Sequence, residues 1–292
     1  MKNYEPYLEV AVKAAKDAGR VQRRSHQHSL HVEYKAEINP VTEVDRICEE
    51  RILRRIRHAF PDHEVLAEET PFERKGSPWR WIVDPLDGTS NYVHGYPCFC
   101  VSIALEYEGE LSLAVVYDPN LRELFHAVKG HGAFLNGQRI RTSRNQDLDT
   151  CLIGTGFPYD IRQYPDFYLA FFRTFMVRTL ALRRPGSAVL DLCYVAAGRF
   201  DGFWEMKLHP WDMAAGCLLV KEAGGKLTDF NGGSHSIYSS LETLATNGYI
   251  HEPMLEIMRE IKTAFPPPWE EEALSHKSRH VSPASAGDPS PP

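Results

Sequence analysis

The segment that most constrains this chain is an apolar run that leads directly into acidic residues. Trp81–Val83 is typical of a buried strand, and Asp84 and Asp87 follow it with Pro85 between them. Proline fixes its own backbone φ angle, so Pro85 stiffens the turn. Both carboxylates can therefore point to one place beyond the strand end. The sequence predicts a polar site there, built on a buried strand.

The residues after the second aspartate suggest an anion next to these carboxylates. Gly88 lets the backbone approach a ligand closely. If Thr89 and Ser90 begin a helical turn, their free N–H groups favour a negative charge at the same place. Carboxylates beside anion-binding amides make chemical sense when a hard cation such as Mg²⁺ lies between them. The alternative is that Asp-Gly is a common turn dipeptide and the acids only cap the turn.

Three further acidic segments have equally ordinary explanations when taken singly. Glu68 and Glu69 follow a short apolar run and could lie in a solvated loop. Asp212 stands at the start of a predicted helix and could be a simple N-cap. Thr42 and Asp45 have the spacing of a capping box, with Asp in place of the usual Glu. The occurrence of all four acidic segments in one chain is harder to explain by four separate ordinary roles, and it favours a shared site.

Composition excludes several classes of protein. Of 292 residues, 43% are hydrophobic and 25% are charged, and the net charge is -6, which favours a globular protein and disfavours direct binding of nucleic acid. No apolar run approaches the roughly 20 residues that cross a bilayer. The start is not typical of a signal peptide. The six cysteines are scattered without a CxxC pair, which indicates reduced core thiols and a cytoplasmic protein.

The chain alternates predicted strands and helices up to about Phe265, which favours an α+β fold of stacked layers. The polar connector 142–147 predicts an N-terminal lobe over about 1–145 and a C-terminal lobe over about 146–265 within a single domain. Residues 266–292 form a Pro- and Ser-rich tail that we expect to be disordered. The periodicity predicts helices near residues 8–19, 42–60, 167–177, 187–197, 211–223 and 253–261, and a hairpin over 100–117.

The order of the acidic motifs resembles the inositol monophosphatase family of magnesium-dependent, lithium-sensitive phosphatases. The motifs are Thr-x-x-Asp at 42, Glu-Glu-Thr at 68, Asp-Pro-Leu-Asp-Gly-Thr at 84 and Trp-Asp-x-Ala-Ala-Gly at 211. The resemblance extends over residues 5–262 and includes the segments 132–137, 185–188 and 222–225. It implies a layered αβαβα sandwich and the hydrolysis of a phosphate monoester.

The resemblance also implies roles for particular residues. Glu68, Asp84 and the carbonyl of Leu86 would hold a first Mg²⁺, and Asp84, Asp87 and Asp212 a second, with Glu68 supporting a weaker third. The amides of Gly88 and Thr89 would bind the phosphate. Thr89, hydrogen-bonded to Asp45, would orient the attacking water together with Glu68. The residues expected to contact the alcohol part of the substrate are Asp87, Gly186, Ser187, Ala188, Glu205 and Asp212, and Lys35 would lie in a mobile lid.

The resemblance leaves the substrate open. The leading expectation is myo-inositol 1-phosphate, with fructose 1,6-bisphosphate, histidinol phosphate and 3'(2'),5'-bisphosphate nucleotides as alternatives. Arg183, Arg184 and Lys207 could recognise a second phosphate or could belong to a surface or a dimer contact, and Ala67 replaces the usual glycine. A homodimer is implied as well. An alternative of another class is a regulatory protein that binds partners on the same fold.

Overall fold

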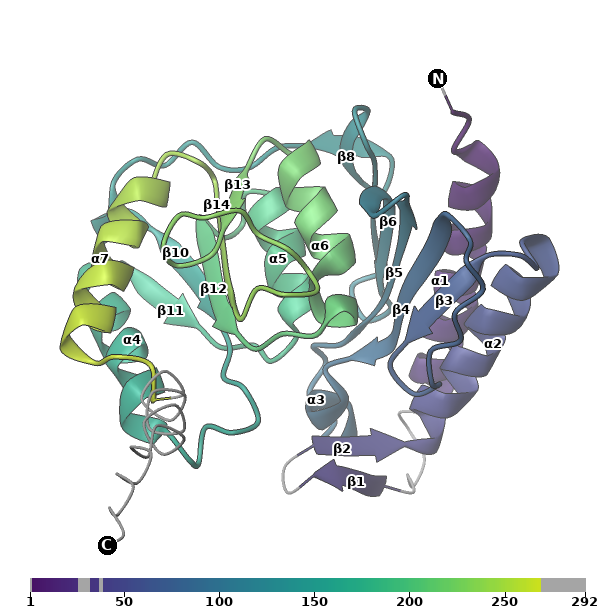
Figure 1. The fold of residues 1–292 in the computed structure, drawn as a ribbon, viewed down its shortest axis with the longest axis horizontal. Coiled ribbons are helices and arrows are strands. Elements are labelled where there is room, and N and C mark those ends of the chain that lie inside the picture. Colours follow the sequence, from purple (N-terminus) through teal and green to yellow (C-terminus); the bar gives the residue numbers. More distant parts are fainter. Residues whose placement is uncertain (1, 26–31, 37–38, 269–292) are drawn as a thin grey trace, which may run out of the picture.

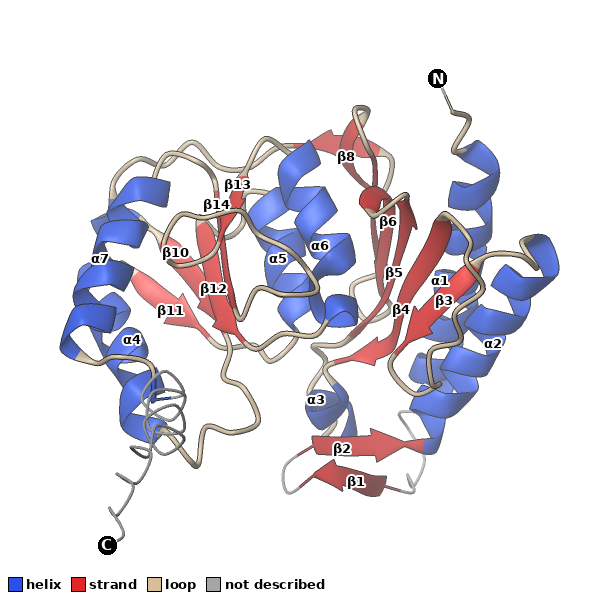
Figure 2. Ribbon diagram, in the orientation of Figure 1, coloured by secondary structure: helices blue, strands red, loops and turns tan. Residues whose placement is uncertain are grey.

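The computed structural model describes residues 2–25, 32–36 and 39–268, which form alternating layers of helices and strands (Figures 1 and 2). Seven α-helices and two large sheets in this part of the chain confirm the predicted α+β class. Most of the Pro- and Ser-rich tail, 269–292, lies outside the described residues, and so does the side chain of Lys35. No helix of the described ranges has the length and apolar character that crossing a membrane requires.

The first sheet has seven strands in the order β3-β4-β5-β6-β7-β8-β9. The first two strands pair in parallel and the others pair antiparallel. The predicted hairpin is confirmed, with its turn at Glu108 and Gly109, where both residues have positive φ. The strands are β3 (Glu64–Ala67), β4 (Trp79–Asp87), β5 (Cys100–Tyr107), β6 (Glu110–Asp118), β7 (Glu123–Val128), β8 (Gly132–Leu135) and β9 (Gln138–Ile140).

The first sheet is apolar on both faces because helices cover both of them. Helices α1 (Glu5–Ser25) and α2 (Glu43–Ala59) cover one face, and α5 (Ala188–Ala196) and α6 (Pro210–Glu222) lie between the two sheets (Figure 1). Successive side chains of a strand point to opposite faces. Trp81 and Val83 accordingly pack with α1 and α2, whereas Ile82 packs with α5 and α6. This arrangement explains why the run before Asp84 is apolar throughout.

The second sheet has five strands in the order β11-β10-β12-β14-β13. Helices α4 (Pro165–Arg178) and α7 (His251–Ala264) cover its outer face, opposite α5 and α6 (Figure 1). The structure thus has the predicted αβαβα layering. The strands of this sheet are β10 (Leu152–Thr155), β11 (Ala181–Arg183), β12 (Gly202–Met206), β13 (Lys226–Thr228) and β14 (Glu242–Thr246).

A small antiparallel hairpin was not predicted. Strands β1 (Val32–Ala36) and β2 (Asn39–Thr42) pair with each other apart from the two large sheets. The hairpin leads directly into α2 and lies close to the short helix α3 (Thr89–Val93) (Figure 1). The segment of Lys35 is therefore a strand of this hairpin. A strand that pairs with only one neighbour does not show the apolar pattern by which buried strands are recognised.

Candidate active site

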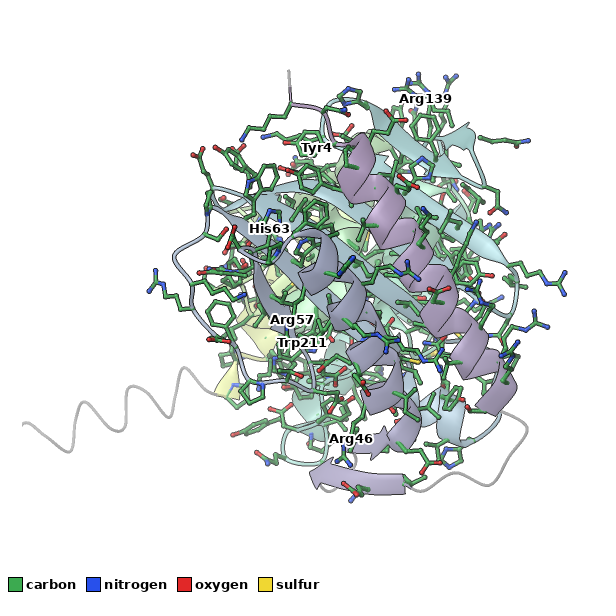
Figure 3. The ribbon with its side chains drawn as sticks, turned by 90° about the vertical axis from the view of Figure 1, so that its right-hand side faces the viewer. Tyr4, Arg46, Arg57, His63, Arg139 and Trp211 are labelled. Atoms are coloured by element: carbon green, nitrogen blue, oxygen red, sulfur yellow. The ribbon has the colours of Figure 1, made fainter. Side chains whose placement is uncertain are left out.

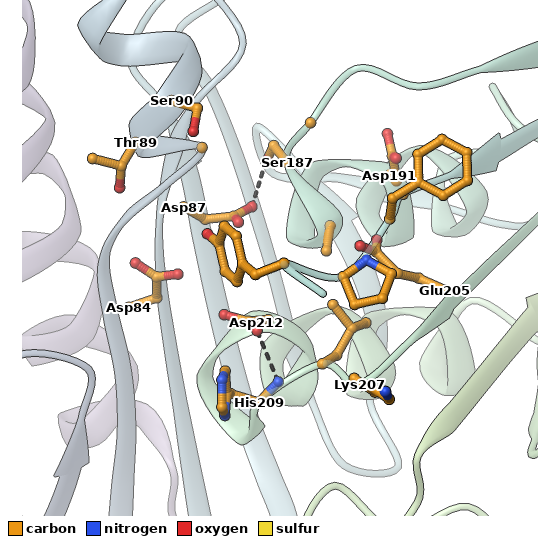
Figure 4. A pocket seen from close by; sticks show the side chains of 18 of the residues that line it. Asp84, Asp87, Thr89, Ser90, Ser187, Asp191, Glu205, Lys207, His209 and Asp212 are labelled. Atoms are coloured by element: carbon orange, nitrogen blue, oxygen red, sulfur yellow. Dashed lines mark hydrogen bonds between the residues drawn. The ribbon is translucent and has the colours of Figure 1, made fainter. Parts of the chain in front are cut away.

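One cavity of about 300 Å³ lies between the two sheets, where the end of β4, the first turns of α3, α5 and α6, and the end of β12 come together. Figure 4 shows its side chains at close range. It is lined by residues that are more than a hundred positions apart in the chain. The predicted site residues on its wall are Glu68, Asp84, Leu86, Asp87, Gly88, Thr89, Gly186, Ser187, Ala188, Glu205 and Asp212.

The two aspartates of β4 are both buried and are held by different hydrogen bonds. The pairing of β4 with β5 is irregular between Asp84 and Asp87, which allows both carboxylates to reach the cavity. The backbone N–H of Leu86 donates to Asp84 Oδ1 at 2.8 Å. Asp87 Oδ2 accepts from the hydroxyl of Ser187 and from the N–H of Val189 at 3.1 Å. Asp87 therefore joins the end of β4 to the start of α5.

Helix α3 begins at Thr89 with Gly88 as its N-cap, so Thr89 and Ser90 do form a first helical turn. Gly88 has φ of 93°, in the left-handed region that favours glycine. A Cβ atom at this position would lie 2.7 Å from the carbonyl oxygen of Cys98, so no other residue fits without a shift. The first N–H groups of a helix have no partner within it. At this end of α3, Thr89 and Ser90 line the cavity.

Asp45 accepts two kinds of hydrogen bond at the same time. One belongs to the capping box of α2, and the other comes from Thr89, which lines the cavity. Its Oδ2 accepts from the backbone N–H of Thr42 at 2.8 Å, which completes the capping box at the start of α2. Its Oδ1 accepts from the hydroxyl of Thr89 at 3.0 Å, and the carbonyl oxygen of Leu86 lies 3.0 Å from the same hydroxyl. The capping interpretation and the functional interpretation of Asp45 are therefore compatible.

Asp212 is held at the start of α6 by a second capping box. The backbone N–H of His209 donates to its Oδ2 at 2.8 Å (Figure 4). The small residues after it allow close packing, because a Cβ atom at Gly216 would lie 2.5 Å from Leu192 Cβ on α5. This packing brings the start of α6 to the cavity. Asp212 therefore faces the same space as the two aspartates of β4.

The two neighbouring glutamates differ in position. Glu68 lines the cavity, whereas Glu69 does not. The backbone N–H of Glu69 instead donates to Glu49 Oε2 on α2 at 2.8 Å. Ala67, which precedes the pair, is buried in β3 and has an ordinary strand position. The β3 strand therefore accommodates the methyl group of Ala67 at the position where the family usually has glycine.

The acidic residues of this wall raise one another's pKa. Burial, and then the charges of Glu68, Asp87 and Asp212, hold the pKa of Asp84 well above its usual value. Burial and then Asp87 raise the pKa of Asp212 in the same way. Burial raises the pKa of Asp87 to about 6, although its hydrogen bonds oppose the shift. Such a group of carboxylates is strained without a positive charge among them.

The chemistry of these donors fits a hard divalent cation. Asp84, Asp87 and Asp212 each use one oxygen for a structural hydrogen bond, which leaves the other oxygen for a ligand. Carboxylate and carbonyl oxygens are the ligands that Mg²⁺ prefers. As they stand, no three His, Cys, Asp or Glu side chains of the described segments are arranged so that they could hold a metal ion. Cation binding would therefore require some of these side chains to move.

The other half of the cavity is formed by β12 and the start of α5. Glu205 is buried there, and burial raises its pKa to about 8, an effect that Arg184 partly opposes. A Cβ atom at Gly156 would lie 2.2 Å from the Glu205 carboxylate oxygens, so this glycine makes room for the side chain. Gly186, Ser187 and Ala188 complete this wall. It presents hydrogen-bonding groups to a molecule bound in the cavity.

Of the basic residues noted in the sequence, only two line the cavity. Lys207 lines it but forms an ion pair with Asp160. Arg183 lies outside it, and its guanidinium donates to the carbonyl of Leu182. Arg184 is thus the one guanidinium that faces the cavity within the described ranges. A second phosphate would have limited cationic support here.

Asp191 is a cavity residue that the sequence reasoning missed. It lies in α5 four residues after Ser187, is 1% exposed, and lines the cavity (Figure 4). Its Oδ1 has no hydrogen-bond partner among the described residues. Burial and then the charge of Glu205 hold its pKa well above the usual value. An acidic residue within the otherwise apolar run 188–193 is the signal that could have revealed it.

Comparison with known proteins agrees with this geometry. The model of the inositol monophosphatase family matches residues 3–263. The chain is 46% identical over 250 residues to the Nus factor SuhB of Pseudomonas aeruginosa, which covers 83% of this chain and 92% of that protein. It is 42% identical over 258 residues to the Nus factor SuhB of Escherichia coli, with 87% and 96% covered.

Solved structures show the same fold. The extragenic suppressor protein SuhB from Bartonella henselae matches with a TM-score of 0.82 at 42% identity, covering 86% of this chain and 98% of that one. An inositol monophosphatase from Anabaena matches with a TM-score of 0.80 at 39% identity, covering 89% and 97%. The chain therefore belongs to the inositol monophosphatase family.

Proposed function

We propose that this protein is a magnesium-dependent phosphomonoesterase whose leading substrate is myo-inositol 1-phosphate. The observation that carries the proposal is the single cavity in which Asp84 and Asp87, the start of α3 and Asp212 meet. These groups come from distant parts of the chain, and each alone has an ordinary structural explanation. Their meeting in one cavity is what a phosphate site with bound cations requires.

The residues that would hold Mg²⁺ are Glu68, Asp84, the Leu86 carbonyl, Asp87 and Asp212, for two ions and a weaker third. Bound Mg²⁺ would lower the pKa of a water molecule and neutralise the charge of the phosphate and of the leaving oxygen. Without cations, the carboxylates would repel a phosphate dianion. The burial of Asp84, Asp87 and Asp212 around one cavity supports the proposal, because a positive charge among such carboxylates would stabilise their ionised forms.

The chain's own groups would position the reactants. Gly88 and Thr89 would direct their backbone N–H groups to the phosphate, since the start of α3 faces the cavity. Asp45 fixes the hydroxyl of Thr89 by accepting its hydrogen bond. Thr89 and Glu68 would then hold the attacking water in line with the bond that breaks. The aspartates bind rather than attack, so no phosphoenzyme is formed.

The opposite wall supports an uncharged polyol as the leaving alcohol. Glu205 and the turn from Gly186 to Ala188 would accept and donate hydrogen bonds to its hydroxyl groups. Arg184 favours a second phosphate, but Glu205 and Asp191 line the same wall and would give one no cationic support. Fructose 1,6-bisphosphate, 3'(2'),5'-bisphosphate nucleotides and histidinol phosphate therefore remain secondary candidates.

The proposal is tested with a panel of these phosphorylated metabolites and the full-length protein. We expect phosphate release from myo-inositol 1-phosphate with Mg²⁺, loss of release with EDTA, recovery when Mg²⁺ is added back, and inhibition by Li⁺. Asp212→Asn should lose the activity, whereas Asp149→Asn, on an exposed turn, should retain it. Full activity of Asp212→Asn, or no release from any compound of the panel, would refute the proposal.

We propose as a second candidate that the protein also regulates through partners. The specific support is that relatives 42% to 46% identical are named Nus factor SuhB. If the Asp212→Asn protein is inactive but still captures the partners of the wild type, the regulatory role is supported. If that variant no longer captures them, partner binding depends on the active site, and an independent regulatory role is contradicted. We also propose a cytoplasmic homodimer, to be tested by light scattering after gel filtration.

A further inference from the structure

A groove with arginines on both sides runs along the outer surface of α1 and α2, on the face shown in Figure 3. It consists of two neighbouring hollows of about 270 Å³ and about 370 Å³ that share Asp17 and Arg51. We call it the arginine groove. Its lining residues are Asp17, Arg20, Val21, Arg24, Ser25, Ile47, Arg51, Arg54, Arg55 and His58.

The concentration of positive charge stands out against the net charge of the chain, which is -6. Arg51, Arg54, Arg55 and His58 form one stripe along α2, at the spacing i, i+3, i+4 and i+7. Asp17 is the one acidic residue that lines the two hollows, and it forms ion pairs with Arg20 and Arg55. A cluster of this sign would attract an acidic partner that the rest of the surface repels.

The stability of α2 explains only part of the stripe, namely His58 in its last turn, where a positive charge is favourable. Like charges three and four residues apart destabilise a helix, and Arg51 has this relation to both Arg54 and Arg55. The ion pair of Asp17 with Arg55 fastens α1 to α2 and accounts for one of them. Arg51 and Arg54 are exposed and have no carboxylate partner in the described ranges. Their charges are therefore available to a ligand.

Apolar side chains line the smaller of the two hollows, of about 270 Å³. Ile47 is 40% exposed although it is a large aliphatic residue, and Val21 lies beside it in the same hollow. From Ile47 to His58 the groove extends for about 16 Å, the length of three helical turns. An amphipathic helix could place an apolar stripe on these side chains and carboxylates beside the arginines. Within the described ranges no Phe, Tyr or Trp lines either hollow, so the groove offers a poor stacking surface for single-stranded nucleic acid.

We propose that the arginine groove docks an acidic amphipathic helix of a partner protein. Arg51 and Arg54 would bind its carboxylates through paired N–H donors, and Ile47 would bury against its apolar stripe. The groove shares no lining residue with the acidic cavity, so this proposal is independent of the phosphatase function. The arginine groove would be the surface through which the proposed regulatory role binds a partner protein.

The test is fluorescence anisotropy with a labelled synthetic peptide of about 18 residues, with leucine at every third or fourth position and glutamate elsewhere. The control probes are the same peptide with glutamine in place of glutamate, and a mixed-sequence RNA. We expect the acidic peptide to bind roughly tenfold or more tightly than the glutamine peptide. The double variant Arg51→Glu/Arg54→Glu should lose this preference, whereas Arg141→Glu/Arg144→Glu, an equal reversal of two exposed charges outside the groove, should not.

The apolar side chains of the smaller hollow separate a protein partner from a nucleic acid. Ile47→Asp should weaken binding of the acidic peptide about tenfold, and circular dichroism with thermal unfolding serves as the check that each variant is folded. Tighter binding of RNA than of the peptide, lost in the double variant but retained in Ile47→Asp, would overturn the proposal in favour of a nucleic-acid surface. Equal binding of the acidic peptide by the wild type and the double variant would show that the groove is only a solvated face.

Discussion

The two halves of the central cavity are both acidic, but they differ in how their carboxylates are held. Asp84, Asp87 and Asp212 each accept a hydrogen bond from a backbone N–H, which fixes one oxygen. In the other half, Asp191 has an oxygen without a partner among the described residues, and Glu205 has Arg184 as its nearby compensating charge. We infer that the first half fixes the reaction and that the second half fixes which alcohol is accepted.

The largest effect should come from removing a carboxylate of the first half. Asp87→Asn keeps the shape but removes the charge that we expect to hold Mg²⁺. We expect kcat to fall about a thousandfold, because the cations supply several kcal/mol of transition-state stabilisation. Steady-state phosphate release measures this. A fall of less than about tenfold would show that the two halves do not differ as we infer.

The next effect should come from the hydroxyl that Asp45 fixes. Thr89→Ala removes the donor of the 3.0 Å hydrogen bond and the group that would orient the water, so kcat should fall roughly a hundredfold. Thr89→Ser keeps the hydroxyl and should restore most of the rate. If serine does not rescue the activity, Thr89 acts through packing at the start of α3 instead.

A smaller effect, on KM rather than kcat, should follow from a change in the second half. Above pH 8, where Glu205 is ionised despite its raised pKa, Glu205→Gln replaces a charged acceptor by a neutral one of the same shape. We expect KM for myo-inositol 1-phosphate to rise about tenfold, the effect of losing a hydrogen bond to a charged group. An equal loss of kcat would place Glu205 in the reaction itself and would remove the distinction between the halves.

The smallest effect concerns stability. Because the pKa of Asp191 is raised in the folded state, folding favours its protonated form. Its contribution is therefore fully present below the unfolded pKa of about 3.9 and is lost as the pH rises through the folded pKa. Asp191→Asn should raise Tm by about 2–4 °C at pH 8 relative to the wild type. The gain should shrink toward pH 5, and a pH-independent Tm difference would contradict this explanation.

Local chemistry made much of the first half predictable from sequence. The aspartates of β4, the glycine that opens α3, and the capping box of Thr42 and Asp45 depend on residues a few positions apart. Their spacing alone left open a cation site or a simple capped turn. The family resemblance supplied the choice between them, the hydrogen bond of Asp45 with Thr89, and the roles of Glu68 and Asp212. The structure brings these residues to one cavity.

The features of the candidate site and of the surface that could not be predicted depend on packing between elements that are distant in the sequence. Ser187 donates to Asp87 a hundred positions away, and no local pattern encodes that contact. The different directions of Arg183 and Arg184 follow from the end of β11, whose position only the sheet determines. The arginines of α1 and α2 resemble two ordinary solvated faces until the helices pack side by side.

The most direct test of the central claim is phosphate release from myo-inositol 1-phosphate, measured during a Mg²⁺ titration of EDTA-treated wild-type and Asp212→Asn proteins in parallel. We predict that the wild type is inactive without metal and recovers with Mg²⁺, and that the variant recovers little at any concentration. Hydrolysis by the wild type without metal, or equal recovery of the variant, would contradict the claim that these distant carboxylates act together on a phosphoryl group.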